Sequence, residues 1–207
     1  MQQKSFLTTL IYRGKKGGSD MDSATAALVL RAKSGDAAAF GELYGKYSKE
    51  LYSFACYFLG SSHWAEDAVQ DAVLSAFRQI QNLRNPEGFR AWMLKILSSV
   101  CKRLYTQNEQ NKNIVSIEDH PDVIDGAGFD GLELSVELKE ALRILSAEER
   151  AVILLSIVCG YKSHEISEIL DISASTVRSK QSRGLKKMQD YLNENGKKGG
   201  NKNEQEE

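Results

Sequence analysis

The chain has 207 residues, of which 42% are hydrophobic and 27% charged, an ordinary balance for a soluble protein with room for two small domains. Its formal net charge of −1 lacks the excess of Lys and Arg that a DNA-binding protein usually carries, although this average conceals charge that is segregated along the chain. No apolar run approaches the length of a membrane span and no Cys-x-x-Cys or His/Cys cluster occurs, which argues against direct membrane insertion and against a zinc site.

The cysteines and histidines give no sign of a catalytic or metal-binding site. Cys56, Cys101 and Cys159 lie far apart among apolar neighbours, as reduced and buried thiols of a cytoplasmic protein would. The three histidines are isolated, and no nucleophile–base pair or paired carboxylates stand out. The sequence therefore predicts a cytoplasmic protein that has no catalytic residue, metal or cofactor.

Both ends of the chain, residues 1–21 and 193–207, are predicted to be disordered extensions. Each contains the run Gly-Lys-Lys-Gly-Gly, which is a flexible composition. Helical periodicity begins only after Met21, so the sequence leaves open whether translation starts at Met1 or at Met21.

The first folded block, residues 22–107, is predicted to be entirely helical. Apolar residues recur at three- and four-residue steps from Ala39 to Phe58, and Gly60 ends that helix. The two serines after it offer N-caps for a helix over 64–80, which has one apolar and one polar face. The polar face carries Glu66, Asp67, Gln70 and Asp71.

A loop over 81–86 leads to a third helix, whose inward stripe includes Phe89 and Trp92. The other side of this helix is predicted to face outward and is basic, because no acidic residue occurs between Arg90 and Gln107. The outward residues are Arg90, Lys95, Ser99, Lys102 and Arg103.

Residues 108–131 interrupt the helical pattern with six acidic residues against one lysine, together with a proline and three glycines. This composition predicts an acidic, flexible linker. The two folded blocks are therefore expected to move independently.

The second block, residues 132–192, is again predicted to be helical and ends in a helix-turn-helix. Ser163 and Ser173 can cap two short helices, and Asp171 occupies the turn position, which needs a left-handed backbone. No acidic residue occurs from Ile172 to Gln189, so the second helix presents only hydroxyl, amide and basic groups, which suit a helix in the major groove. The alternative for this helix is an ordinary solvated basic surface.

Several motifs resemble a known family. The segments 147–150, 160–170 and 175–180 are similar to the C-terminal domain of sigma factors. The segments 65–72 (AEDAVQDA) and 89–93 (FRAWM) are similar to the N-terminal sigma domain. Their order and the acidic linker between them resemble the extracytoplasmic-function (ECF) subfamily of sigma-70-type RNA polymerase sigma factors.

The resemblance implies that the partners are core RNA polymerase and promoter DNA, with an anti-sigma factor as a candidate third. It assigns polymerase docking to Glu66, Asp67, Gln70 and Asp71. It assigns the −10 element to the loop residues Arg84 and Asn85 and to the helix residues Arg90, Lys95, Ser99 and Lys102. It assigns the −35 element to Ser175, Thr176, Arg178, Ser179, Lys180, Ser182, Arg183 and Lys187. Where the family commonly has an apolar residue, this chain has Gln181.

A one-component transcriptional regulator with a C-terminal helix-turn-helix is the main alternative. Such a regulator needs an effector-binding domain, and residues 22–107 contain neither a Gly-rich phosphate loop nor a metal-ligand cluster. The linker also has two interpretations, since its negative charge can mimic nucleic acid or can serve solubility alone.

Overall fold

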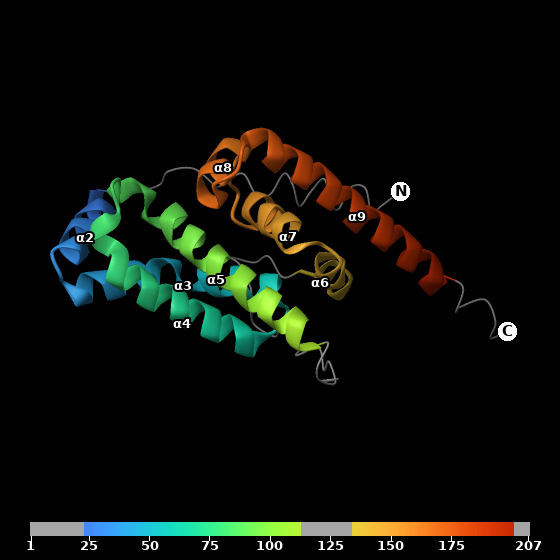
Figure 1. The fold of residues 1–207 in the computed structure, drawn as a ribbon, viewed down its shortest axis with the longest axis horizontal. Helices are drawn as coiled ribbons and strands as arrows, with labels where there is room; N and C mark the ends of the chain where they lie inside the picture. The colour runs from blue at the N-terminus through green and yellow to red at the C-terminus, as the bar shows by residue number, and fades with distance from the viewer. Residues whose placement is uncertain (1–22, 113–133, 201–207) are drawn as a thin grey trace.

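The computed structural model describes residues 23–112 and 134–200, and Figure 1 shows that they fold into helices. Within these two ranges no strand occurs, so the predicted all-α class is confirmed. No helix of the described ranges combines the length and the apolar character that crossing a membrane requires.

The first unit is built around three long helices that run side by side (Figure 1). Helix α3 packs against both α4 and α5, and α2 covers one end of α3. The elements are α2 (Ser23–Lys33), α3 (Ala37–Leu59), α4 (Ser62–Gln79), the 3-10 turns η1 (Ile80–Asn82) and η2 (Pro86–Gly88), and α5 (Phe89–Lys112).

Local sequence signals begin and end these helices. The Asp36 carboxylate accepts a hydrogen bond of 3.0 Å from the backbone amide three residues on, and so caps α3. Gly60 adopts a φ of 72°, and its amide donates to the Cys56 carbonyl over 2.8 Å. The Ser61 hydroxyl then caps α4 by accepting from the Trp64 amide. The predicted helix end at Gly60 and the serine cap after it are confirmed.

Aromatic side chains fill the core of the first unit. Phe54, Phe58 and Phe89 are fully buried, and the Phe89 ring meets Phe40 edge-on at 6.3 Å between centroids. Trp92 is half-buried, with its ring 6.1 Å from that of Phe89. The prediction that Phe89 and Trp92 belong to the inward stripe is confirmed.

The second unit wraps three short helices around one long helix. Helix α9 packs across α6, α7 and α8. Gly184 makes the α7–α9 approach close, because an added Cβ at this position would lie 3.1 Å from Cγ1 of Ile153. The elements are α6 (Val136–Arg143), α7 (Ala147–Ile153), a π-helical turn η3 (Leu154–Val158), α8 (Ser163–Leu170) and α9 (Ala174–Gly200).

Three predicted boundaries differ from the structure. Helix α5 continues past residue 107 to Lys112, and α9 continues past residue 192 to Gly200, since extending an established helix costs less than starting one. Helix α8 is capped one residue earlier than predicted. The N-cap residue is Lys162 rather than Ser163, and the Lys162 amide donates to the Glu165 carboxylate over 2.7 Å. The predictions for residues 1–22, for 113–133 in the linker and for 201–207 lie outside the described residues.

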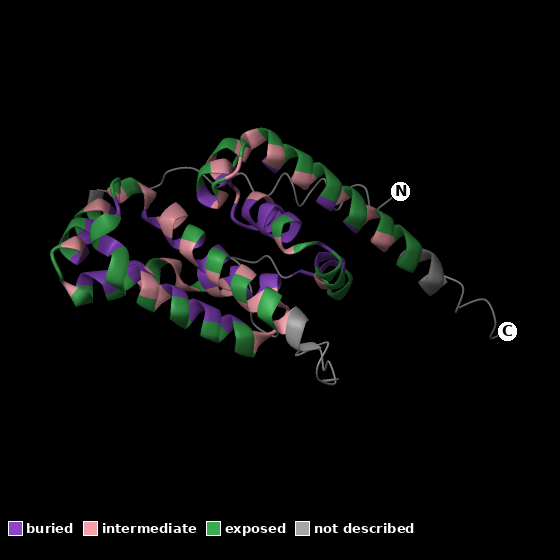
Figure 2. Cartoon of the chain, viewed as in Figure 1, coloured by how far each residue is buried: buried purple, intermediate pink, exposed green. Residues whose placement is uncertain are grey.

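The two units are packed against each other in this structure. Helix α5 lies against α7 and α8, while α3 contacts α6, α7 and the π-helical turn. Figure 2 shows buried positions on the facing sides of both units, and the buried residues form one continuous cluster. The sequence predicted the two helical units. It also predicted that they move independently, so their contact differs from the prediction.

Candidate nucleic-acid and polymerase interfaces

Helices α8 and α9 form the predicted helix-turn-helix. Asp171 has a left-handed backbone, with φ 55° and ψ 47°, as the turn position requires. The Ser173 hydroxyl accepts a hydrogen bond of 3.1 Å from the Thr176 amide and caps α9. Ile166 and Val177 are fully buried between the two helices. The turn residue and the second cap are therefore confirmed.

The residues predicted to bind the −35 element divide into two sets on α9. At about 100° per residue, positions 178, 182, 186, 179 and 183 share an arc of roughly 140°, opposite the buried Val177 and Met188. All of these arc positions are exposed. The outward arc is defined as Arg178, Ser179, Ser182, Arg183 and Lys186, and it faces away from the rest of the second unit.

Lys180 and Lys187 lie at the edge of that arc and are tied to α7. Lys180 is half-buried and forms an ion pair with Glu148. The Lys187 ammonium lies 2.8 Å from the carboxylate of Glu149. Ser175 and Thr176 are also engaged, because each hydroxyl lies 2.8 Å from the hydroxyl of the capping Ser173. These four predicted residues therefore have protein partners that the sequence did not indicate.

Glu149 links the start of α7 to α9. Its carboxylate accepts a hydrogen bond of 3.1 Å from the Ser146 amide, while the Ser146 hydroxyl accepts from the Glu149 amide, which is a capping box. Burial alone would raise the pKa of Glu149, but the Lys187 ammonium and the Ser146 donors outweigh it and hold the pKa below its ordinary value. The carboxylate therefore stays ionised and holds α9 against α7.

The loop before α5 keeps its predicted residues exposed. Arg84 and Asn85 both lie at the surface, and the Asn85 side chain accepts a hydrogen bond of 3.1 Å from the Glu87 amide, which caps η2. On α5, Lys95 and Ser99 are also exposed. These four residues can reach a ligand without rearrangement.

Arg90 and Lys102 do not face outward as predicted. The Arg90 side chain is 24% exposed and forms an ion pair of 2.5 Å with Glu50 on α3. It also donates to the Cys159 carbonyl over 2.9 Å and lies 4.7 Å from the centre of the Tyr161 ring. Lys102, about 120° farther around α5, is also half-buried. Around α5, Arg90 falls within about 20° of the buried Leu97 and Cys101, so its own helix already places it beside the core, and the second unit covers it further.

The predicted polymerase-docking residues Glu66, Asp67, Gln70 and Asp71 are all exposed on α4. Asp71 forms an ion pair of 2.8 Å with Arg103 of α5, which joins the two helices at the surface. The other three residues lie along an open face of α4. The structure therefore brings these side chains together as predicted.

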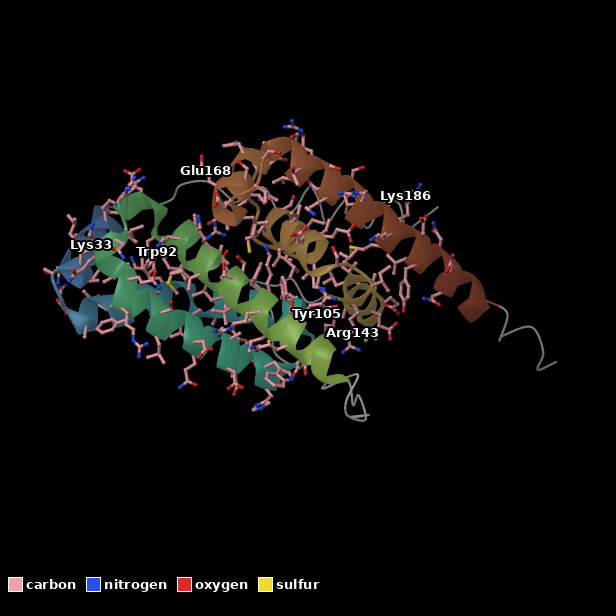
Figure 3. All side chains as sticks on the ribbon, in the orientation of Figure 1. Lys33, Trp92, Tyr105, Arg143, Glu168 and Lys186 are labelled. Carbon is pink, nitrogen blue, oxygen red and sulfur yellow. The ribbon has the colours of Figure 1, made fainter. Side chains whose placement is uncertain are left out.

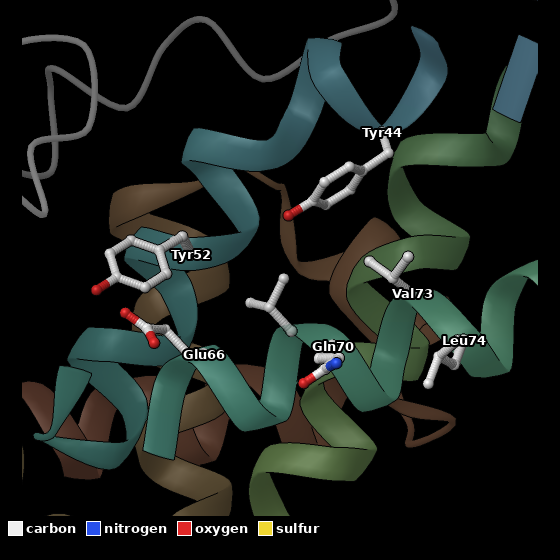
Figure 4. A pocket seen from close by; sticks show the side chains of 7 residues that line it. Tyr44, Tyr52, Glu66, Gln70, Val73 and Leu74 are labelled. Atoms are coloured by element: carbon white, nitrogen blue, oxygen red, sulfur yellow. The ribbon is translucent and has the colours of Figure 1, made fainter. Parts of the chain in front are cut away.

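A groove lies beside this face (Figure 4). Its cavity volume is about 330 Å³, and it lies between α3 and α4. Burial raises the pKa of Tyr52 to about 12, so its hydroxyl remains a proton donor at the rim. The lining residues are Tyr44, Tyr52, Glu66, Val69, Gln70, Val73 and Leu74.

Exposed apolar side chains on α4 were missed by the sequence reasoning. Leu74 is 49% exposed and Phe77 is 43% exposed. Leu74 lies outside the apolar stripe of its helix. A large apolar residue on a polar face can be seen in the sequence and could have indicated an exposed apolar patch. An apolar, partly hollowed face with a few polar groups is suited to binding a protein partner.

Two family models match the chain in order. Sigma-70 region 2 matches residues 43–110, and Sigma-70 region 4 matches residues 135–188. Together they span more than half of the chain, and one lies within each of the two units. This chain is an ECF sigma factor. The sigma factors are transcription initiation factors rather than enzymes.

Its curated relatives are bacterial ECF sigma factors. It is 28% identical to ECF RNA polymerase sigma factor SigE of Mycolicibacterium smegmatis, over 83% of this chain and 69% of the relative. It is 26% identical to SigM of Mycobacterium tuberculosis, over 85% of this chain and 90% of the relative. It is 25% identical to SigW of Bacillus subtilis, over 79% of this chain and 94% of the relative.

Solved structures share the fold. CnrH, solved in complex with the cytosolic domain of CnrY, matches with a TM-score of 0.61 and 22% identity over 83% of this chain and 98% of the other. The sigma factor RpoE of Bartonella quintana, solved with the anti-sigma factor NepR, matches with a TM-score of 0.59 and 25% identity over 74% of this chain and 96% of the other. Region 2 occupies the place where a one-component regulator would need its effector-binding domain. The regulator alternative is therefore not supported.

Proposed function

We propose that this sigma factor directs promoter-specific transcription initiation by binding core polymerase through α4 and promoter DNA through α5 and α9. The observation that carries the proposal is the outward arc of α9, which presents cations and hydroxyls on a helix held by a helix-turn-helix. Base edges in the major groove are read by such donors, and phosphates are bound by such charges.

Arg178 and Arg183 are the proposed −35 readers. Both are exposed on the outward arc, and they flank Ser179 and Ser182. Arginine can form a bidentate contact with guanine, which contributes about 1–3 kcal/mol of base discrimination. Lys180 and Lys187 are proposed to contact phosphate, which requires them to exchange their carboxylate partners for DNA.

The −10 element is assigned to Arg84, Asn85, Lys95 and Ser99, which are exposed, and to Arg90 and Lys102, which are covered by the second unit. A single DNA strand bound along α5 would need the lysines of that helix to contact its phosphates. The loop residues Arg84 and Asn85 lie just before α5, where a base taken out of the stack could be received.

Core polymerase is proposed to dock on the α4 face that carries Glu66, Asp67 and Gln70, with Leu74 and the groove beside it. An anti-sigma factor is a further proposed partner, because the RpoE structure of similar fold was solved with one. The proposal includes a cytoplasmic location, which the three free, buried cysteines support.

In vitro transcription with core polymerase and a randomised promoter library tests the proposal. Arg178→Ala and Arg183→Ala should each change the selected −35 sequence, while Lys49→Ala, an exposed charge on α3, should leave it unchanged. Transcription at wild-type level and selectivity by both arginine variants would refute the assignment of α9. Loss of transcription in all variants, including Lys49→Ala, would refute the division of roles between helices.

A further inference from the structure

The loop between α4 and α5 carries two of the residues to which the proposed function assigns the −10 element. It consists of the 3-10 turns η1 and η2 with an extended piece of chain between them. Leu83 and Asn85 have extended backbones, with φ and ψ of −67° and 109° for the first and −108° and 112° for the second. Leu83 is buried, whereas Arg84 and Asn85 are exposed. The buried leucine therefore anchors a piece of chain whose next two residues are open to a ligand.

Local hydrogen bonds fix the two ends of this loop. The Leu83 amide donates to the Ile80 carbonyl over 3.1 Å and closes η1, and the Gly88 amide donates to the Asn85 carbonyl over 3.0 Å and closes η2. Neither bond involves the peptide that joins Leu83 to Arg84. The orientation of that peptide has to be set by a contact from elsewhere in the fold.

Lys33, the last residue of α2, makes this contact (labelled in Figure 3). Its ammonium donates to the Leu83 carbonyl over 2.6 Å, although the two residues are 50 positions apart. Helix α2 lies against both η1 and η2, so the ammonium reaches the loop from a helix that packs on it. Lys33 is half-buried, and a hydrogen bond from a cation to a carbonyl is stronger than one between neutral groups.

The end of α2 is itself held in place. The Arg31 guanidinium forms an ion pair of 2.6 Å with Asp36, whose carboxylate also caps α3. The Ser34 hydroxyl donates to the Arg31 carbonyl over 2.7 Å, and Ala32 is buried. The backbone of Lys33 is therefore tied to α3, and its side chain reaches the loop from a fixed point.

The contact controls the direction of the next side chain. The Leu83 carbonyl and the Arg84 amide belong to one peptide plane. A rotation of that plane changes the direction in which the Arg84 side chain leaves the backbone, and it moves Asn85 as well. By binding the carbonyl, Lys33 favours one orientation of the plane. A side chain that is already oriented loses less conformational entropy when it binds a base.

We propose that Lys33 is a positioning residue for the −10 element, which holds the Leu83 peptide so that Arg84 and Asn85 meet a base in one arrangement. The proposal rests on the role assigned above to these two loop residues. The Lys33 ammonium is engaged by a carbonyl rather than offered to a phosphate, so Lys33 acts through the loop. Its loss should lower the discrimination between bases and should not lower the affinity evenly for all of them.

Lys33→Met is the test variant, because methionine keeps the unbranched stem of the side chain and removes the donor. Lys33→Arg is the rescue variant, since a guanidinium can donate to the same carbonyl. Lys49→Met is the matched control, because Lys49 is an exposed lysine of α3 and its substitution removes the same charge. Arg84→Ala reports whether the loop reads the −10 element at all.

Each variant is assembled with core polymerase and transcribes a library that is randomised at both the −10 and the −35 positions. Lys33→Met should reduce the preference for the selected −10 base by roughly two- to tenfold, the range for leaving one side chain to be ordered on binding. The −35 preference and the affinity for core polymerase should stay unchanged. Lys33→Arg should recover most of the −10 preference, and Lys49→Met should behave as the wild type.

Amide hydrogen exchange of the free, full-length protein is a second measurement, and it does not depend on polymerase. Lys33→Met should speed exchange in the segment 81–88 while leaving exchange in α3 and α9 unchanged. Faster exchange throughout the first unit would show that Lys33 holds the fold rather than the loop, and would overturn the proposal.

Three outcomes of the transcription experiment would also refute the positioning role. An unchanged −10 preference in Lys33→Met would show that Lys33 serves stability alone. An equal loss for every −10 sequence, with a salt slope of promoter binding that is shallower by about 0.7, would show that Lys33 contacts a phosphate of the single strand. An unchanged −10 preference in Arg84→Ala would refute the assignment of the loop in the proposed function, and the positioning role would fall with it.

Discussion

The side chain of Arg150 is a buried cation on which the end of α6 depends. It is 3% exposed, and its guanidinium donates to the carbonyls of Leu142, Arg143 and Leu145 over 2.9, 2.9 and 3.3 Å. A fourth hydrogen bond, of 2.5 Å, reaches the Phe58 carbonyl of α3. The last carbonyls of α6 have no partner within their own helix, so this cation satisfies them and stabilises the end of the helix.

Arg150→Met replaces the guanidinium by an apolar group of similar length and leaves those four carbonyls without this donor. A buried acceptor left without its donor costs about 1–3 kcal/mol, so the loss of these hydrogen bonds should lower the free energy of unfolding by about 3–5 kcal/mol. For a chain of this size the midpoint of thermal unfolding should then fall by roughly 6–20 °C. Urea denaturation followed by helical circular dichroism measures the loss.

Arg178→Met is the control, because Arg178 is exposed on α9 and the same substitution there should cost less than about 0.5 kcal/mol. If Arg150→Met instead unfolds within about 1 kcal/mol of the wild type, the carbonyls at the end of α6 do not depend on this guanidinium. The account of the interface given above would then lose its central contact.

Three further predictions concern the turn, a carboxylate and the thiols. Because the backbone of Asp171 is left-handed, Asp171→Gly should raise the free energy of unfolding by up to about 1 kcal/mol, and Asp171→Val should lower it by about 1–2 kcal/mol. Urea denaturation of both variants measures these changes, and the opposite order of stability would be inconsistent with the turn. The folded protein lowers the pKa of Glu149, so the ionised carboxylate stabilises the fold at neutral pH, and this contribution is lost as the pH falls below about 5. Glu149→Gln should therefore flatten the acidic part of the curve of stability against pH. An unchanged curve would rule out a stabilising ion pair between Glu149 and Lys187. Burial raises the pKa of the Cys56 thiol to about 11 and raises the pKa values of Cys101 and Cys159 as well. An aromatic disulfide reagent at pH 8 should therefore label none of the three thiols quickly in the native protein and all three in urea. Rapid labelling of the native protein would contradict their burial.

The features that the sequence predicted are those that depend on near neighbours. Gly60, Ser173 and Asp171 act within one turn of their own helix, so their residue types suffice to predict a helix end, a cap and a turn. The apolar period likewise identifies Phe89 and Val177 as buried residues. These predictions need no knowledge of the partner helices.

The features that were missed depend on residues far away in the sequence. Arg90 is a charged residue beside the core stripe of its own helix, and its burial is explained by Glu50 of α3 and the Cys159 carbonyl of the second unit, 40 and 69 positions away. Lys180 finds its partner Glu148 on another helix, 32 positions away. The period of a single helix cannot reveal such contacts, so the burial of Arg90 and the ion pair of Lys180 could not be predicted from the sequence.

The π-helical turn η3 has a consequence for insertion and deletion along this chain. Here the Cys159 amide donates to the Leu154 carbonyl, five residues earlier, rather than to the residue four earlier. A turn of this kind holds one residue more than an α-helical turn, and everything after it is rotated by about 100° relative to a regular helix. Deleting one residue between Leu154 and Val158 would restore the regular ladder and turn Cys159 and Tyr161 away from α5. The deletion of a single residue would thus decide whether the second unit can pack against the first.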